Sequence, residues 1–98
     1  MITRIVKLTI DPEKTTYFFD EIIPFQAKIR QQPGCSYLEF FQDINTKGII
    51  FTYSNWESED DLNNYRQTEL FDTAWSMAKK LFVAKPEAWS IESVKKFV

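Results

Sequence analysis

Hydrophobic residues recur along the chain at two different spacings, which separate strands from helices. Over residues 2–10 the apolar side chains fall mainly on even positions, the two-residue period of a strand with one buried face. Over residues 12–31 they return every three or four positions, which predicts a helix with Asp11 as its N-cap. Pro24 lacks a backbone N–H group, so we expect this helix to kink or split there.

Two strands joined by a short turn follow this helix. Residues 35–43 and 49–53 are rich in aromatic and β-branched side chains, and the turn residues between them predict a hairpin. Both strands have apolar side chains on both faces. Helices on one side of a sheet leave its other side open, so an apolar second face needs another cover. In so short a chain the simplest cover is a second copy, and the pattern predicts a homodimer.

The rest of the chain predicts a helical region and a last strand. Ser58 and Asp61 have the spacing of a capping box, and Thr68 is placed to restart the helix after a break. Pro86 ends the helical region, and alternation over residues 89–97 predicts a strand. The inward-facing stripe of the second helical piece consists of Phe71, Trp75, Ala78 and Phe82.

The resulting order of elements is β-α-β-β-α-β, the split pattern of the ferredoxin-like fold. Right-handed connections then place both helices on one face of a four-stranded antiparallel sheet. We therefore expect an α+β protein with a single domain over residues 1–98, because a chain of this length provides one hydrophobic core.

Composition and charge exclude several classes of function. A net charge of −2 without a basic cluster argues against nucleic-acid binding. No apolar run is long enough for a membrane span or a signal peptide, and the one cysteine, Cys35, cannot form an internal disulfide, so we expect a cytoplasmic protein. The chain has no histidine, which excludes histidine-activated nucleophiles and histidine-ligated zinc or haem. We expect neither a metal site nor a cofactor.

Aromatic residues make up 16% of the chain, which is a high fraction for its length. They either fill a ring-rich core or line a ligand cavity or a subunit interface. Trp56 follows a strand and precedes a helix, where it either fills the core beneath the turn or lines a cavity with its indole N–H free to meet a ligand. Arg4 interrupts the apolar face of the first strand, and it either snorkels to solvent or reaches a wet cavity. Polar candidates beside Trp56 are Arg4, Asn55 and Tyr53, and candidate lining residues are Tyr37, Phe51, Tyr65, Phe71 and Trp75.

Four segments of the chain carry a family resemblance. Residues 53–75 read YSNWESEDDLNNYRQTELFDTAW, and residues 1–11, 31–35 and 85–90 read MITRIVKLTID, QQPGC and KPEAWS. Together they resemble the antibiotic biosynthesis monooxygenase family over essentially the whole chain. The resemblance implies a dimeric α+β barrel, in which two ferredoxin-like sheets pack face to face around sites for small aromatic molecules.

The resemblance also implies roles for individual residues. Trp56 matches the tryptophan at the family's pocket. Haem-degrading members have a histidine ligand where this chain has Trp75, so haem is not expected. Quinol-oxidising members have an asparagine and a tyrosine at positions that look like Thr52 and Leu62 here, so the usual catalytic set is incomplete.

Two functions of different class remain. The first is a cofactor-independent monooxygenase of a quinol or phenolic substrate, in which a dry pocket favours the anion that reduces dioxygen. Trp56 would hold the substrate ring, and Arg4, Asn55 or Tyr53 would stabilise the oxyanion. The alternative is a non-catalytic dimeric module that binds a small hydrophobic ligand or a partner, which explains the aromatic content without a general base.

Overall fold

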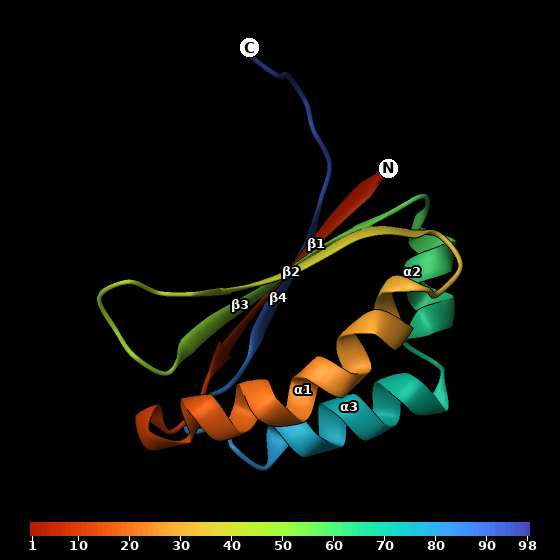
Figure 1. Ribbon diagram of the computed structural model, residues 1–98. Helices are drawn as coiled ribbons and strands as arrows, with labels where there is room; N and C mark the ends of the chain where they lie inside the picture. Colours follow the sequence, from red (N-terminus) through yellow and green to blue (C-terminus); the bar gives the residue numbers. More distant parts are fainter.

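The computed structural model describes residues 1–98 and contains one antiparallel sheet of four strands, with the helices on one of its faces (Figure 1). The elements in chain order are β1 (Ile2–Thr9), the 3-10 turn η1 (Pro12–Lys14), α1 (Thr15–Arg30), β2 (Cys35–Gln42), β3 (Ile49–Trp56), α2 (Glu59–Tyr65), α3 (Glu69–Lys79) and β4 (Glu87–Ile91). This arrangement confirms the α+β, ferredoxin-like fold predicted from the sequence.

The strands lie in the order β2-β3-β1-β4, so β3 and β1 form the centre of the sheet. These two strands pair along the full length of β1, beginning with Ile2 opposite Trp56. On the other side of β3, the register of β2 shifts between Cys35 and Tyr37, which leaves Ser36 as an extra residue. This bulge lets Cys35 face the helices, although Tyr37 does not.

The first helix begins as predicted and is not split at its proline. Asp11 is the N-cap, since its Oδ1 accepts a hydrogen bond from the backbone N–H of Glu13 at 3.0 Å. The opening turn is a 3-10 turn, after which α1 continues through Pro24 without a break. Pro24 is exposed, so water can satisfy the carbonyl that loses its donor, and the prediction of a split is wrong.

Both predicted caps of the second helical region are confirmed. Ser58 Oγ accepts from the backbone N–H of Asp61 at 3.1 Å, and Thr68 Oγ1 accepts from that of Phe71 at 3.1 Å. The region is therefore two helices, α2 and α3, with a short turn between them. Figure 1 shows that this turn changes the direction of the chain, so that α2 lies at one end of the sheet.

Gly34 connects α1 to β2 and packs against the start of α2. Its φ of 85° lies in the left-handed region that favours glycine. Its carbonyl accepts from the backbone N–H of Glu57 at 2.8 Å, and a Cβ at this position would collide with the Asp61 side chain. A larger residue would therefore push the turn away from α2.

Two groups of buried side chains stabilise the layer between sheet and helices. The smaller group lies under α2 and contains Cys35, Trp56 and Leu62. Cys35 is buried and unpaired, as the sequence predicts. The larger group joins α1 and α3 to the centre of the sheet and consists of Leu8, Ile10, Phe18, Ile22, Ile50, Ala74 and Ala78.

Two strands end at other residues than predicted, and their neighbours explain why. β3 continues past Tyr53 to Trp56, because β1 and β2 both offer backbone partners up to that residue. The last strand covers Glu87–Ile91 rather than residues 89–97. Ile91 pairs with Thr3, close to the beginning of β1, so the residues beyond it have no strand beside them. They lead away from the sheet in Figure 1.

The sheet face opposite the helices is uncovered and apolar. Tyr53 meets the rings of Tyr37 and Phe41 edge to face, with centroids 5.8 and 6.2 Å apart. Trp89 and Ile91 of β4 are each 45% exposed. We call this surface the open face. Separately, none of the helices combines the length and the hydrophobicity that a bilayer crossing requires.

Candidate functional site

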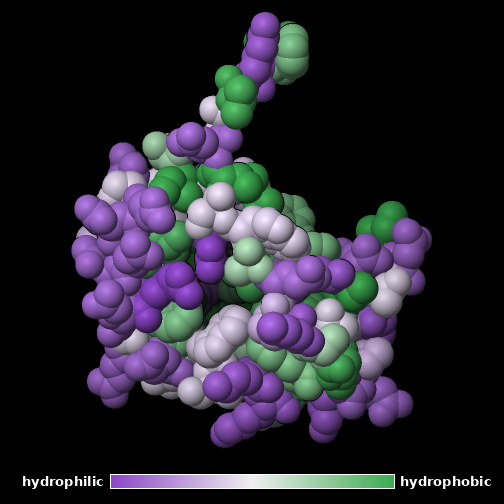
Figure 2. All heavy atoms as spheres, turned by 180° about the vertical axis from the view of Figure 1, so that it is seen from behind, coloured by the Kyte–Doolittle hydropathy of each residue, from purple (hydrophilic) through white to green (hydrophobic).

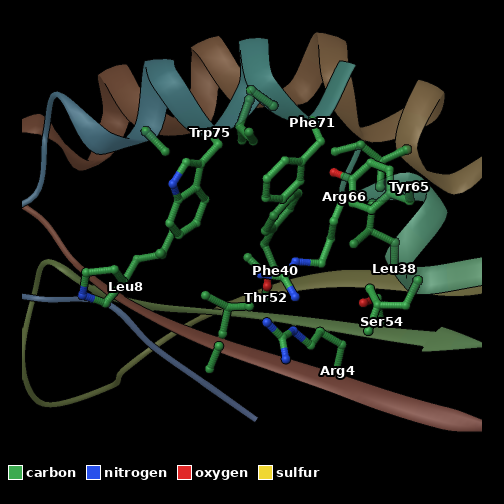
Figure 3. Close-up of a pocket in the computed structure, with 18 of the residues that line it drawn as sticks. Arg4, Leu8, Leu38, Phe40, Thr52, Ser54, Tyr65, Arg66, Phe71 and Trp75 are labelled. Atoms are coloured by element: carbon green, nitrogen blue, oxygen red, sulfur yellow. The ribbon is translucent and has the colours of Figure 1, made fainter. Parts of the chain in front are cut away.

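A cavity of about 320 Å³ lies between the sheet and the helices, and 15 of its 20 lining residues are hydrophobic. Its lining comes from all four strands and all three α-helices. Figure 3 shows the strands on one side of the cavity and the rings of α3 on the other. The molecular surface is hollowed near the middle of the view in Figure 2, with hydrophobic and hydrophilic residues around the hollow.

Strand alternation decides which residues reach this cavity. On β1 and β3 the even-numbered side chains point toward the helices, and they place Arg4, Thr52, Ser54 and Trp56 in the lining. The sheet therefore supplies a floor with one guanidinium and two hydroxyl groups. The helices supply apolar and aromatic side chains, with Arg66 as the exception.

Trp56 both fills the core and forms part of the cavity wall. It is 1% exposed, and its ring stacks on that of Tyr65 with centroids 5.1 Å apart and an interplanar angle of 21°. Its Nε1–H donates to Ser54 Oγ at 2.9 Å. The indole N–H thus has an internal partner and is not free to meet a ligand. Trp56 fills the core, as the first of the two predicted roles has it, and its ring also lines the cavity.

A continuous row of rings extends from Trp56 along the helices. Tyr65 meets Phe71 edge to face at 5.4 Å, and Phe71 stacks on Trp75 at 5.9 Å. The row gives the cavity an apolar, aromatic wall, which suits an aromatic ligand. Burial raises the pKa of Tyr65 to about 12, so its phenol is protonated at neutral pH.

Two arginines line the cavity, one from strand β1 and one from the end of helix α2. Arg4 is partly buried on β1, and its Nη1 donates to Ser90 Oγ at 3.0 Å. Arg66 lies directly after α2, and both guanidinium groups point into the same part of the cavity in Figure 3. Burial, and to a smaller extent the charge of Arg66, lower the pKa of Arg4.

Sequence reasoning missed Arg66. The available signal was its place one residue after the last residue of a helix, where the negative end of the helix dipole favours a cation. Its approach to Arg4 depends on how α2 docks against the sheet, which periodicity does not show. Arg4 itself reaches the cavity, which was the second of the two interpretations of that residue.

Four candidates do not line this cavity and lie on the open face instead. Asn55 Oδ1 accepts from Thr3 Oγ1 at 2.7 Å on that face, and Tyr53 contacts Tyr37 there. Phe51 shares the odd-numbered side of β3 with them. Neighbouring strand residues point to opposite faces, so Trp56 and Asn55 cannot belong to one site within a protomer. Of the predicted residues, the cavity brings together Arg4, Trp56, Tyr65, Phe71 and Trp75.

The lining sets the chemistry available to the site. No aspartate, glutamate or histidine is among the lining residues, and the protein has no group of three His, Cys, Asp or Glu side chains that could hold a metal ion. The arrangement can enclose a planar molecule, exclude water from it and stabilise negative charge on it.

Comparisons with known proteins agree with this architecture. A family model described as antibiotic biosynthesis monooxygenase matches residues 1–75. A protein of Pestalotiopsis microspora, "Putative monooxygenase GME11364", is 24% identical over 82 residues, which cover 83% of this chain and 68% of that protein.

Solved structures share the fold at low sequence identity. The crystal structure of an antibiotic biosynthesis monooxygenase is 20% identical with a TM-score of 0.89, covering 97% of this chain and 100% of that one. A conserved protein from Methanosarcina mazei Go1 is 17% identical with a TM-score of 0.85, covering 93% and 91% respectively. At these identities the likeness establishes the fold.

Proposed function

We propose that this chain, which belongs to the antibiotic biosynthesis monooxygenase family, is a monooxygenase with a small phenol or quinol as its substrate. The observation that carries the proposal is the cavity beneath the sheet, where a row of rings faces Arg4 and the hydroxyl groups of Thr52 and Ser54. Its volume of about 320 Å³ lies in the lower part of the range for small-molecule sites, and it suits a compact aromatic molecule.

The substrate supplies the electrons in the proposed reaction. A phenol that loses its proton becomes an electron-rich anion that reduces dioxygen. One oxygen atom forms a new carbonyl group on the ring, and the other leaves as water with the phenolic hydrogen and one ring hydrogen. A phenol is thereby converted into a quinone, all four electrons come from the ring, and no bound cofactor or metal takes part.

The lining residues favour the anion rather than remove its proton. The positive charge of Arg4 lowers the free energy of a phenolate beside it, and exclusion of water strengthens that interaction. A general base is absent from the lining, and Tyr65 is protonated at neutral pH. The proton therefore passes to water as the substrate enters, and Trp56 shapes the wall against which the ring stacks.

The proposal includes a homodimer that buries the open face. An apolar sheet face of this kind needs a cover, and face-to-face packing of two sheets provides it without another partner. In this dimer each cavity stays between its own sheet and helices. Tyr53 and Asn55 would then lie in the interface, close to the cavity only through the thickness of the sheet.

Dioxygen uptake tests the proposed activity. Purified protein is incubated with a panel of naphthols, quinols, anthrones and catechols in an oxygen electrode, and the products are identified by mass spectrometry. We expect one dioxygen consumed per product formed, and loss of most of the rate in Trp56→Phe. Trp89→Phe is the matched control, because it makes the same change on the open face.

A non-catalytic binding module is the second candidate. The resemblance to quinol-oxidising members implies an asparagine and a tyrosine at positions that look like Thr52 and Leu62 here, and the lining has no general base. Binding of the panel without any dioxygen uptake would favour this function over the monooxygenase.

A further inference from the structure

The charges around the cavity are unbalanced in one direction. Arg4 and Arg66 both line it, and no carboxylate does. The one salt bridge of the protein joins Lys7 to Glu87 and involves neither arginine. Two like charges at one cavity repel each other, and the partly buried Arg4 also loses hydration without gaining a counter-ion. An anion between them would relieve both effects.

At this end of the cavity, several hydrogen-bond donors also lack an acceptor within the protein. Arg4 uses Nη1 to hold Ser90, which fixes the direction of its guanidinium group and leaves other N–H groups unused. Ser54 Oγ accepts from Trp56, so its own hydrogen remains available to a ligand. Arg66 lines the cavity and is exposed, and its side chain makes no hydrogen bond or ion pair within the protein.

The rest of the lining determines what carries the negative charge. Most of it is apolar, and the rings of Phe71 and Trp75, which stack on each other with an interplanar angle of 10°, form an aromatic part of the cavity wall. A strongly hydrated inorganic anion would gain nothing from that wall. An aromatic molecule would gain burial of its ring, while its charged oxygen group meets the two arginines.

We propose that the cavity selects aromatic anions, with a carboxylate or ionised phenol oxygen held between Arg4 and Arg66 and the ring against Phe71 and Trp75. Arg66 is then a binding residue, which reaches the ligand from α2 while Arg4 reaches it from β1. The inference rests on the proposed function only in treating this cavity as the substrate site, and it names the charge of the substrate.

Matched pairs of ligands test the charge preference without turnover. Calorimetric titration compares 1-naphthoate with 1-naphthamide, and 2,4-dinitrophenol, which is ionised at neutral pH, with its methyl ether. We expect each anion to bind at least about tenfold more tightly than its neutral partner, since hydrogen bonds to a charged group are stronger than neutral ones. A preference within only one pair would support the proposal and identify the anionic group.

Variants of the two arginines test which side chains cause the preference for anions. Arg66→Met and Arg4→Met should each weaken binding of the anion about tenfold and leave the neutral partner unchanged, whereas Arg66→Lys should retain part of the preference. Lys47→Met is the control, because it removes the same charge from the exposed hairpin turn. Arg66 is itself exposed, so its variants are expected to fold even if Arg4→Met does not.

The outcomes separate this inference from the monooxygenase proposal. Equal affinity for anion and neutral partner in both pairs, or equal losses in Lys47→Met and Arg66→Met, would overturn the anion selectivity whatever the oxygen electrode reports. Selective anion binding without dioxygen uptake by any phenol would support the inference and count against the monooxygenase alone.

Discussion

At the scale of single residues, Trp56 illustrates how one side chain can serve both stability and function. Its ring is almost completely buried, yet one side of it belongs to the cavity wall. Ser54 accepts its N–H and thereby prevents a buried unpaired donor, which would destabilise the fold. The position therefore depends on a neighbour two residues away on the same strand.

Ser54→Ala should therefore destabilise the protein by about 1–3 kcal/mol, because the buried indole N–H loses its acceptor. Thr52→Val is the control, since it removes a hydroxyl from the same cavity floor while leaving the Trp56 hydrogen bond intact. Urea unfolding of both variants gives the comparison. Equal free energies of unfolding for the two variants would contradict this role of Ser54.

The raised pKa of Tyr65 leads us to expect a lower free energy of unfolding at high pH. Its pKa rises from 10.0 in the unfolded chain to about 12 in the folded protein because of burial. Below pH 10 the phenol is protonated in both the folded and the unfolded state, and its contribution to the free energy of unfolding is complete. Above pH 10 the unfolded chain loses the proton first, so this contribution to stability declines and is gone near pH 12. Partial exposure limits the contribution to ~1–2 kcal/mol.

Tyr65→Phe tests this expectation, because a phenylalanine has no proton to lose. Unfolding free energies of the wild type and the variant are compared between pH 8 and 12, with Tyr17→Phe on the exposed side of α1 as the control. We expect the wild type to lose stability relative to Tyr65→Phe across the upper half of this range. Parallel curves for the two proteins would contradict the burial of the phenol.

At the scale of elements, the turn between α2 and α3 brings Tyr65 and Arg66 to the cavity. Thr68 stabilises the turn at both ends: its Oγ1 accepts from the Phe71 N–H at 3.1 Å and donates to the Tyr65 carbonyl at 2.7 Å. The helix break is thus fixed by one side chain that contacts a residue of each helix.

Thr68→Ala should lower the free energy of unfolding by about 1 kcal/mol, as for loss of an N-cap. Thr73→Ala, in the exposed middle of α3, is the control and is expected to be neutral or slightly stabilising, since alanine has the higher helix propensity. Thermal unfolding followed by circular dichroism measures both. A Thr68→Ala variant as stable as Thr73→Ala would show that the break is held by packing alone.

The same elements show how far sequence reasoning reaches. The caps at Asp11, Ser58 and Thr68 follow from local chemistry, and the structure confirms each. Strand alternation could also have separated Trp56 from Asn55, because it assigns neighbouring residues to opposite faces. Which of the two faces holds the site depends on where the helices pack.

Other features depend on distant partners that local patterns do not contain. The bulge at Ser36 arises from pairing with β3, and the last strand ends at Ile91 because β1 offers no further partner. The meeting of Arg4 and Arg66 requires both the β1–β4 pairing, which supplies Ser90, and the docking of α2. The cavity consequently depends on contacts between residues far apart in the sequence, whereas the fold class follows largely from local sequence patterns.

At the scale of the whole molecule, the protomer exposes more surface than its size explains. Its accessible area is 6664 Å², whereas a monomer of 11.6 kDa is expected to expose about 5,800 Å². The excess of roughly 800 Å² includes the exposed residues after Ile91, which lead away from the sheet, as well as the uncovered open face. Much of the open face is aromatic, with Tyr37, Phe41 and Trp89 all more than 40% exposed.

We therefore expect a dimer in sedimentation velocity at micromolar concentrations, held by the open faces. Tyr53→Lys should shift the protein to monomers, because Tyr53 lies on the inner strand β3 and a buried lysine in the interface would lack a partner. Ile44→Lys makes a comparable change in the hairpin turn, where the side chain is 94% exposed, and should leave the dimer intact. If the wild type were a folded monomer, the open face would not be covered by a second copy and the predicted dimer would be wrong. A Tyr53→Lys monomer that retains the ligand preference would show that each cavity works within its own protomer.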